Sequence, residues 1–454
     1  MFMSWFASSV LAAASAANGT CTFKADTDVG DQSSIISHTR GTFTQQQCCD
    51  QCRANAACAV AALLDASTGN EGCWLKSGEG GTYAHKGTTA CYSGRSPSPS
   101  PESVPLTLLR PAAAPLARCM DGSPGGYYHA ANASSTKWVI DLQGGGECAS
   151  KKNCDGRVGS ALFSSKYFSA RTTLGKLAQA GTANARLATW NRVFVPYCSQ
   201  DLWTGQRAAA SDETYGYFFA GHHILAAVFD ALEAAGGLAS ATDIVLTGES
   251  AGGIGVWPNV DYLAGRYPAA RVVAAPIAGF YFFADPYRGP GHTASGLADF
   301  REAAWPAHFD LWQSFVDEDC AAAIEPWRCV LANNSFPYVS SHAFVIEAQT
   351  DQVVLNAHDW VPQDDPNWTA PVLDYMAQWH DNMTVALAPS MDPASPNGVF
   401  NPACFIHTSF SASSPLLSGL NYLDAFANWY FGGAGAKTKL QDDCGILCNP
   451  TCNH

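Results

Sequence analysis

Short apolar runs and longer apolar segments alternate along most of the chain, from residue 106 to residue 454. Each short run ends at glycine or at polar residues, which is typical of a buried strand that meets a loop. The longer segments are rich in alanine and long enough for buried helices. We expect strands at 138–143, 192–198, 243–247, 272–283 and 343–347, and helices at 217–235 and 251–264. This alternation predicts an α/β fold, with a mostly parallel sheet and helices on both faces.

The first hundred residues follow a different pattern, dominated by cysteine and then by proline. Seven cysteines lie between residues 21 and 93: Cys21, Cys48, Cys49, Cys52, Cys58, Cys73 and Cys91. This density predicts a small disulfide-rich module over residues 21–93. Serine and proline then alternate, and since proline fits neither a helix interior nor a central strand, residues 94–105 are expected to form an extended linker. Residues 106–454 should therefore form the main domain.

The N-terminus has the features of a secretory signal peptide. Trp5 and Phe6 open a short apolar run, and Ala14-Ser15-Ala16 supplies a small-x-small cleavage site. We expect residues 1–16 to be removed, although the usual positive charges before the run are missing. A membrane anchor is the alternative, but the run is short for a bilayer span, and no later segment is a convincing transmembrane helix. Five Asn-x-Ser/Thr sequons also favour the secretory pathway; they begin at Asn18, Asn132, Asn333, Asn367 and Asn382.

The overall composition indicates the cellular compartment and limits the kinds of partner that the protein could bind. Seventeen cysteines in 454 residues indicate structural disulfides in an oxidising compartment. Cys49 and Cys52 form the sequence's one Cys-x2-Cys pair, with no matching Cys or His pair nearby, so we expect neither zinc nor any other metal or organic cofactor. A net charge of −14 argues against nucleic acid and anionic membranes as partners. It favours a neutral or partly masked substrate over a fully de-esterified polyanion.

Gly248-Glu-Ser-Ala-Gly252 matches the Gly-x-Ser-x-Gly pattern of a nucleophilic serine. Such a serine stands on a sharp turn from strand to helix, and small neighbours let the turn close against adjacent strands. The expected strand at 243–247 and helix at 251–264 supply that context, and Gly253 adds another small residue. Ser250 is therefore the predicted nucleophile of an α/β-hydrolase-like domain. The alternative is a plain glycine-rich turn that caps a helix.

A nucleophilic serine needs a histidine base and an acid that orients the base. In α/β-hydrolases both follow the serine along the chain, each shortly after a strand. Asp351 and His407 meet this condition, and Cys404 could fix the loop of His407 by a disulfide. Order and spacing alone leave other candidates open: His292, His308, His342, His358 and His380 for the base, and Asp285, Asp317 and Asp359 for the acid.

Three consecutive glycines, 144–146, directly follow the strand that is expected to end at Gln143. Glycines allow backbone N–H groups to converge on one oxygen, as in an oxyanion hole, and the N–H of Ala251 after the nucleophile would complete such a site. The alternative is a phosphate-binding loop, but the Gly-Lys-Ser/Thr sequence that such a loop requires does not follow.

Several stretches of the main domain resemble the pectin acetylesterase and Notum family of carboxylesterases. They are residues 138–148, 194–198, 248–253 and 403–407, and a C-terminal part with 428–431 and the cysteines at 444, 448 and 452. The resemblance implies an α/β-hydrolase core and a serine ester hydrolase. It assigns the nucleophile to Ser250, the acid to Asp351, the histidine to His407, and the oxyanion donors to the backbone of Gly145, Gly146 and Ala251.

Three positions depart from the usual pattern of the plant members of this family. Gln143 and Glu147 stand where plant members have Glu and Trp, and Glu249 stands where they have Cys or a small residue. The aromatic wall beside the oxyanion hole is thus lost, and two carboxylates are gained. A carboxylate beside a buried alkyl tunnel carries a large desolvation cost. We therefore expect an acyl pocket that favours short chains, unless both glutamates point away.

All ten cysteines of the main domain are expected to pair. Cys148–Cys154 and Cys320–Cys329 would close short loops, Cys119–Cys198 would tie the first loop to a strand, and Cys404 would bond to Cys444 or Cys448, with Cys452 in the remaining pair. The unpaired cysteine should then be Cys48 or Cys49, since adjacent cysteines rarely both find suitable geometry. By its cysteine spacing, the N-terminal module loosely resembles PAN/apple domains, which are binding modules.

These observations predict a secreted serine esterase, extracellular or in a cell wall, that removes O-acyl groups, chiefly O-acetyl, from a polysaccharide such as pectin. His407 would deprotonate Ser250, and Asp351 would hold the imidazole. The N-terminal module could bind a carbohydrate or a protein. Two alternatives stay open. A Notum-like lipid deacylase needs a deep apolar pocket, and a non-catalytic carbohydrate-binding protein would not need the complete set of Ser, His and Asp.

Overall fold

The computed structural model describes residues 21–29, 35–55, 58, 60–68, 71–76, 82–84, 86–92, 103–178, 186–293, 297–362, 368–432 and 435–452. The expected signal peptide, residues 1–16, and most of the expected linker lie outside the described residues. The chain divides into two compact units, Met1–Ser100 and Pro101–His454. Each unit is described by itself.

In the smaller unit, an antiparallel sheet packs against one helix. The strand order is β1-β7-β4-β5-β3, and helix α1 (Gln45–Ala54) contacts β4, β5 and β7. The strands are β1 (Thr22–Lys24), β3 (Ile35–Arg40), β4 (Val60–Leu64), β5 (Gly72–Lys76) and β7 (Thr88–Tyr92), while β2 (Thr27–Val29) and β6 (Thr82–Ala84) form a separate pair. A capping box begins α1, because the side chain of Thr44 accepts from the Gln47 N–H and that of Gln47 accepts from the Thr44 N–H.

Three disulfides anchor α1: Cys21–Cys49, Cys48–Cys73 and Cys52–Cys58. The prediction that Cys48 or Cys49 is unpaired is therefore wrong. Successive residues of a helix point about 100° apart, so Cys48 reaches β5 while Cys49 reaches Cys21, and the two do not compete. The free cysteine among the described residues is Cys91 on β7, where burial raises the pKa of the thiol to about 12.

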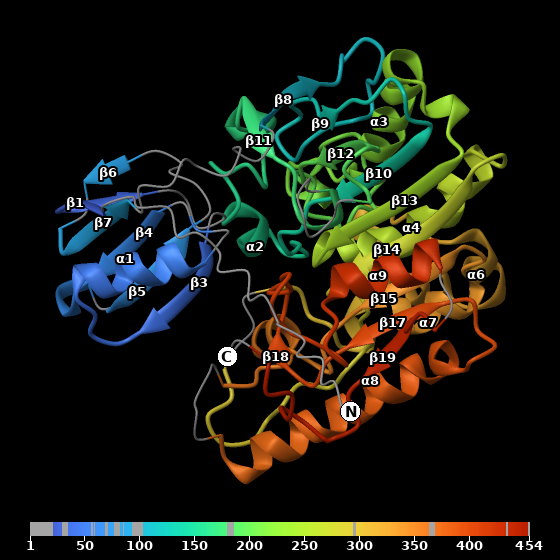
Figure 1. The fold of residues 1–454 in the computed structure, drawn as a ribbon. Coiled ribbons are helices and arrows are strands. Elements are labelled where there is room, and N and C mark those ends of the chain that lie inside the picture. The colour runs from blue at the N-terminus through green and yellow to red at the C-terminus, as the bar shows by residue number, and fades with distance from the viewer. Residues whose placement is uncertain are drawn as a thin grey trace, which may run out of the picture. The chain divides into compact units, whose positions relative to one another are not determined.

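A ten-stranded sheet organises the larger unit. Its order is β11-β8-β9-β12-β10-β13-β14-β15-β17-β19, and the row from β10 to β19 is visible in Figure 1. Its strands are β8 (Ser103–Leu108), β9 (Gly126–Ala130), β10 (Lys137–Leu142), β11 (Arg171–Thr173), β12 (Asn191–Val195), β13 (Asp243–Glu249), β14 (Arg271–Ile277), β15 (His342–Ile346), β17 (Gly398–Asn401) and β19 (Lys439–Gln441). Strands β12 to β19 in this order are parallel, and β11, β8 and β9 add an antiparallel edge. The predicted mostly parallel α/β sheet is confirmed.

Two cores lie on the opposite faces of this sheet. Side chains alternate between the faces, so that on β13 Ile244 and Leu246 belong to one core and Val245 to the other. Residues of α3 (Gly221–Gly236), α4 (Ala251–Arg266), α5 (Trp305–Trp312) and α8 (Ala370–Met391) contribute to the first core, and residues of α9 (Tyr422–Phe431) to the second. The shorter helices α2 (Lys151–Asp155), α6 (Glu318–Ala323) and α7 (Ala332–Ser335) lie in connecting segments.

Several elements end or begin away from the predicted boundaries. Strand β12 stops at Val195, and β14 stops at Ile277, where the next residue, Ala278, has a φ of 48° that a strand cannot accommodate. Helix α3 begins at Gly221 rather than at residue 217, because a short 3-10 turn that ends with a left-handed Tyr215 precedes it. Residues 103–105 of the expected linker belong to β8.

Five disulfides stabilise the larger unit. Cys119–Cys198, Cys148–Cys154 and Cys320–Cys329 form as predicted. The last two pairs are Cys404–Cys452 and Cys444–Cys448, so the prediction that Cys404 bonds to Cys444 or Cys448 is wrong. The reason is local: the N–H of Asn449 donates to the carbonyl of Ala403, which brings the turn before Cys452 beside Cys404.

Among the described helices, none combines the length and the apolar composition that crossing a membrane requires. The longest is α8, with 22 residues, and its sequence includes Asp374 and Asp381.

Candidate active site

Ser250 stands between the end of β13 and the start of α4, in a turn that its backbone angles define. Its φ of 57° and ψ of −125° let the chain reverse within one residue. The N–H of Ser250 donates to the carbonyl of Ile277 on β14 at 3.0 Å. A Cβ on Gly252 would lie 2.0 Å from the carbonyl oxygen of Leu142, so only glycine lets the first turn of α4 approach β10 this closely. The expected strand, turn and helix around Ser250 are thus present.

Asp351 and His407 meet through two short strands that pair in parallel. These are β16 (Thr350–Asp351) and β18 (Phe405–Ile406), and His407 directly follows the second. The Nδ1–H of His407 donates to Oδ2 of Asp351 at 2.7 Å. The other oxygen of Asp351 accepts from the Val354 N–H at 2.9 Å, and the residue is fully buried. This pair fixes the ring of His407 and leaves its Nε2 without a hydrogen bond to the described residues.

A cavity of about 260 Å³ brings the candidate residues together. Ser250 and His407 both line it, and Asp351 lies behind His407. The remaining wall residues are Gly145, Gly146, Glu147, Arg157, Ala251, Ile254, Tyr281, Leu297, Val353 and His358. Gly145 and Gly146 have positive φ angles of 148° and 69°, a conformation that favours glycine and turns the loop toward the turn at Ser250. The cavity therefore contains all three predicted oxyanion residues as well as the predicted nucleophile and base.

One competing histidine, His358, also lines this cavity. Its Nδ1–H donates to the carbonyl of Ala298 at 2.9 Å, and its ring stacks on Phe300 with centroids 3.7 Å apart. Its orienting partner is thus a carbonyl and not a carboxylate. The other candidates do not line the cavity: His292, His308, His342, His380, Asp285, Asp317 and Asp359. Burial raises the pKa of Asp359 to about 7.

The two glutamates that replace family residues lie differently. Glu147 is 2% exposed and forms part of the cavity wall, where its Oε1 accepts from the Ala298 N–H at 2.8 Å. Glu249 lies outside the wall, and its carboxylate pairs with Lys176 on the 3-10 turn η4 (Lys176–Ala178) at 3.5 Å. Glu147 therefore belongs to the cavity wall, and Glu249 does not.

Sequence reasoning did not find Lys176 or Arg157. The ammonium of Lys176 also donates to the carbonyl of Thr408, next to His407, at 2.6 Å. The Nη2 atom of Arg157 lies 3.1 Å from the position of a Cβ on Gly146, so the guanidinium rests against the glycine loop. No spacing pattern connects these residues with Ser250, Asp351 and His407. The closest available signal was Arg157 standing shortly after the glycine loop in the sequence.

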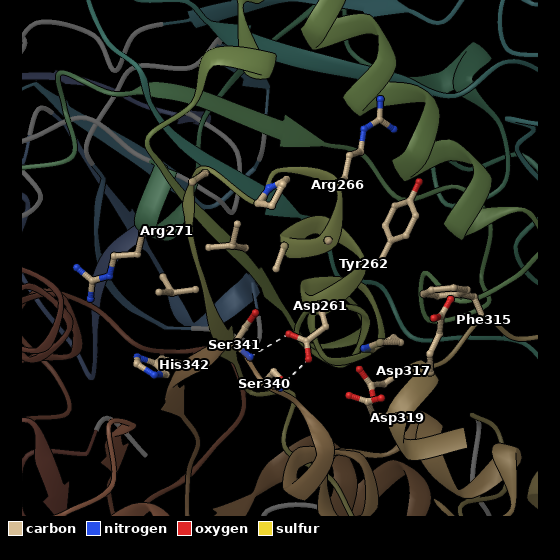
Figure 2. Close-up of a pocket in the computed structure, with 18 residues that line it drawn as sticks. Asp261, Tyr262, Arg266, Arg271, Phe315, Asp317, Asp319, Ser340, Ser341 and His342 are labelled. Carbon is tan, nitrogen blue, oxygen red and sulfur yellow. Dashed lines mark hydrogen bonds between the residues drawn. The ribbon is translucent and has the colours of Figure 1, made fainter. Parts of the chain in front are cut away.

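A larger cavity, of about 1020 Å³, lies at the opposite end of the sheet (Figure 2). It is lined by the first residues of β14 and β15, including Arg271 and His342, whereas Ser250 follows the other end of β13. The carboxylate of Asp261 accepts from the N–H groups of Ser340 and Ser341, as the dashed lines in Figure 2 show. Asp317 caps α6 through the N–H of Cys320. These carboxylates support the local backbone, and the predicted nucleophile and base, Ser250 and His407, line the smaller cavity and not this one.

In the part of the chain that the structure describes, no group of three or more His, Cys, Asp or Glu side chains is arranged to hold a metal ion.

Comparison with known proteins places this chain in a family. The profile of the Pectinacetylesterase family matches residues 98–453. Palmitoleoyl-protein carboxylesterase notum1 of Xenopus laevis is 34% identical over 248 residues, which cover 52% of this chain and 50% of the frog protein. Human palmitoleoyl-protein carboxylesterase NOTUM is 31% identical over 305 residues, covering 64% and 58%. Pectin acetylesterase 5 of Arabidopsis thaliana is 26% identical over 385 residues, covering 78% and 86%.

The chain thus spans about half the length of these Notum proteins and most of the length of the plant esterase. The predicted resemblance is confirmed, and the names of these relatives all describe the hydrolysis of carboxylic esters. Because the family profile covers most of its length, the chain belongs to the pectinacetylesterase family.

Proposed function

We propose that this protein is a secreted serine carboxylesterase with an α/β-hydrolase domain, and that Ser250, His407 and Asp351 form its catalytic triad. The observation that carries the proposal is one arrangement: a serine with a strained backbone shares a cavity with a histidine whose Nδ1 is held by a buried carboxylate and whose Nε2 has no hydrogen-bond partner among the described residues. Esterase chemistry needs this combination of nucleophile, base and orienting acid.

The geometry supports a two-step mechanism. Nε2 of His407 takes the proton from Oγ of Ser250 as Oγ attacks the ester carbonyl carbon. The negative charge that forms on the carbonyl oxygen would be held by the N–H groups of Gly145, Gly146 and Ala251. The alcohol leaves with the proton from Nε2, and the acyl group stays on Ser250. Water then attacks the acyl-enzyme while His407 takes its proton, and the carboxylic acid leaves.

Within this activity, we propose an O-acetyl ester on an extracellular polysaccharide such as pectin as the substrate. The related plant enzymes are named pectin acetylesterases, and the longest of these matches span most of this chain. The cavity is small, about 260 Å³, which suits an acetyl group better than a long alkyl chain, and the buried Glu147 is an acidic residue in its wall. Arg157 adds a positive charge to the same wall, which partly offsets the net charge of −14 for an acidic polysaccharide.

A second candidate is the removal of a longer acyl group from a protein, since the more similar relatives by identity are named palmitoleoyl-protein carboxylesterases. The acyl chain length distinguishes the two. We expect kcat/KM to fall from the acetyl to the butyryl to the octanoyl ester of p-nitrophenol. Faster turnover of the octanoyl ester would favour the lipid deacylase.

The matched control is Ser250→Ala, which should fold normally and lose about 10⁴-fold in kcat. Near-normal turnover in this variant would contradict the assigned nucleophile. If the wild-type protein hydrolyses none of these esters but binds an oligosaccharide, the non-catalytic carbohydrate-binding alternative is favoured.

Secretion and a binding role for the smaller unit complete the proposal. Eight disulfides among the described residues suit an oxidising compartment. The smaller unit, one helix held to a sheet by disulfides, would act as a PAN/apple-like module for a carbohydrate or a protein ligand.

A further inference from the structure

A second buried carboxyl group lies directly behind the acid of the triad. Glu347 follows the last residue of β15 and is fully buried. Its backbone is held on both sides: its N–H donates to the carbonyl of Phe400 at 3.1 Å, and its carbonyl accepts from the side chain of Asn401 at 2.7 Å. The backbone that carries this side chain is therefore fixed by the neighbouring strand β17.

The two carboxyl oxygens of Glu347 have different surroundings. Oε2 accepts from the N–H of Phe280 at 2.8 Å. Oε1 accepts no hydrogen bond from an N–H or O–H group of the described residues, although it is buried. The Glu347 carboxyl lies beside the carboxyl of Asp351, close enough for a hydrogen bond between the two groups if one of them carries a proton. Two ionised carboxylates cannot form such a bond, because both only accept.

The kind of donor, and not the number, decides which of the two groups holds the proton. Asp351 accepts from the Val354 N–H and from His407, whose ring gains a positive charge during the proposed reaction. Glu347 accepts only from uncharged backbone N–H groups, those of Phe280 and Ala348. The proton therefore belongs on Glu347, where it satisfies the buried oxygen that otherwise has no partner.

We propose that Glu347 is a positioning residue for the triad: as a neutral carboxylic acid, it donates a hydrogen bond to Asp351 and so holds the carboxylate that orients His407. This inference rests on the proposed function, since it assigns Glu347 a role in the same triad. The order of hydrogen bonds is then Glu347 to Asp351, His407 to Asp351, and Ser250 to His407 during reaction. The site carries one negative charge instead of two, which matches the single positive charge that develops on the imidazole.

The charged and titratable neighbours favour this protonation. They are Asp351 on β16, Tyr281 in the segment after β14, and His407 beyond Asp351, whereas Asn401, the last residue of β17, is neutral. Tyr281 donates its own O–H to the carbonyl of Ala278 and does not neutralise Glu347. Burial first, and the negative charge of Asp351 second, raise the pKa of Glu347 well above its ordinary value.

Two substitutions of Glu347 distinguish its proposed hydrogen bond to Asp351 from a role in packing alone. Glu347→Gln keeps a donor toward Asp351 and an acceptor for Phe280, so it should keep kcat/KM within about threefold near pH 6. Glu347→Leu removes both and should lower kcat by about ten- to a hundredfold, a loss of the size seen when an outer hydrogen-bond partner of an active-site residue is removed. The loss should fall on kcat more than on KM, because Glu347 does not line the cavity.

The pH profile and the melting temperature give readouts that do not depend on the leucine variant. In the wild type, Glu347 must stay protonated in the folded state, so raising the pH from 5 to 9 should lower its stability relative to Glu347→Gln. The wild type should also lose activity on the alkaline side, and Glu347→Gln should lose it less. A tenfold loss in Glu347→Gln, or parallel melting curves against pH for both proteins, would overturn the proposal.

Ser250→Ala distinguishes a failure of the proposed esterase function from a failure of the proposed role of Glu347. If this variant stays active, the proposed function fails, and the melting comparison still tests the proton on Glu347 because it needs no turnover. If Ser250→Ala is inactive while Glu347→Gln and the wild type share one pH profile and parallel melting curves, the triad stands and only the role of Glu347 is refuted.

Discussion

Ser250 holds a backbone conformation that serine rarely adopts. A φ of 57° with a ψ of −125° lies outside the regions that residues with a Cβ prefer. Such a residue stores about 1–3 kcal/mol, which the surrounding structure must retain. Here β13 and α4 continue on either side, and the bond from the Ser250 N–H to Ile277 pins the turn to β14. The strain is the condition for presenting Oγ at the cavity.

The strain can be measured with two variants that both lack the nucleophile. Glycine usually costs about 0.5–1 kcal/mol relative to alanine in a regular element. At position 250 we expect the reverse: Ser250→Gly should be more stable than Ser250→Ala by up to about 1 kcal/mol, because glycine accepts a positive φ. Urea unfolding of the two variants gives the difference. If the alanine variant is the more stable one, the elbow is not strained.

Replacing the proposed acid of the triad should lower the activity and leave the fold intact. In Asp351→Asn, the amide oxygen can still accept a hydrogen bond from His407, but the negative charge that stabilises the imidazolium is lost. We therefore expect kcat to fall by about 10⁴-fold with the fold intact. Turnover of p-nitrophenyl acetate measures the loss of activity, and circular dichroism shows whether the fold is intact. The exposed carboxylate variant Asp381→Asn on α8 serves as the control and should behave as wild type. A change confined to KM would contradict the role of Asp351.

At the scale of elements, Lys176 connects three segments that carry the site. Its ammonium pairs with Glu249 at the end of β13 and donates to Thr408 after β18, while the residue itself belongs to η4. Lys176→Met should therefore loosen the position of His407 and lower kcat/KM by about tenfold, the equivalent of one hydrogen bond from a charged group. Its matched control is Lys166→Met, which removes a lysine that pairs with Asp121 away from the cavity. Equal losses in the two variants would show that Lys176 has no special role.

Elements whose formation depends on the local sequence pattern could be predicted from the sequence. Elements that form only by pairing with distant segments could not. The strand at β13, the elbow and the helix α4 follow one another in sequence, so residues 243–266 could be interpreted together. Strands β16 and β18 have two residues each, too few for any periodicity, and their pairing alone brings Asp351 to His407. Order along the chain pointed to both residues, but it could not exclude His358 or the other candidates.

The remaining contacts of the site left no signal in the sequence. Lys176 lies 232 residues from Thr408 along the chain, and Glu347 looks like the polar end of an apolar strand. The same limit explains the disulfide errors: cysteine spacing could not show that α1 directs Cys48 and Cys49 to different partners, or that Asn449 places Cys452 beside Cys404.

At the scale of the whole molecule, the two units have separate cores. The described cysteines of the smaller unit that are paired bond within it, and the same holds for those of the larger unit. The family profile begins at residue 98, close to the boundary at Pro101. Both observations indicate that the larger unit has what it needs to fold alone.

A shortened protein that begins at Pro101 should therefore keep its activity on a small ester. We expect kcat/KM for p-nitrophenyl acetate within about twofold of the full-length value, because every residue that lines the cavity belongs to the larger unit. Activity on an intact polysaccharide should fall further if the smaller unit binds the polymer. An inactive or unfolded product would show that the units depend on each other.

The disulfide between Cys404 and Cys452 also determines when the site becomes complete. During translation Ser250 leaves the ribosome first, Asp351 and His407 follow, and Cys452 comes after all of them. The later segment adds a further anchor to the loop that bears His407, when the N–H of Asn449 reaches Ala403 and Cys452 pairs with Cys404. If Ser250 and His407 act as proposed, a chain that is still being made lacks this support of its base, and we expect full hydrolytic activity only after synthesis has passed Cys452 and oxidation has joined it to Cys404.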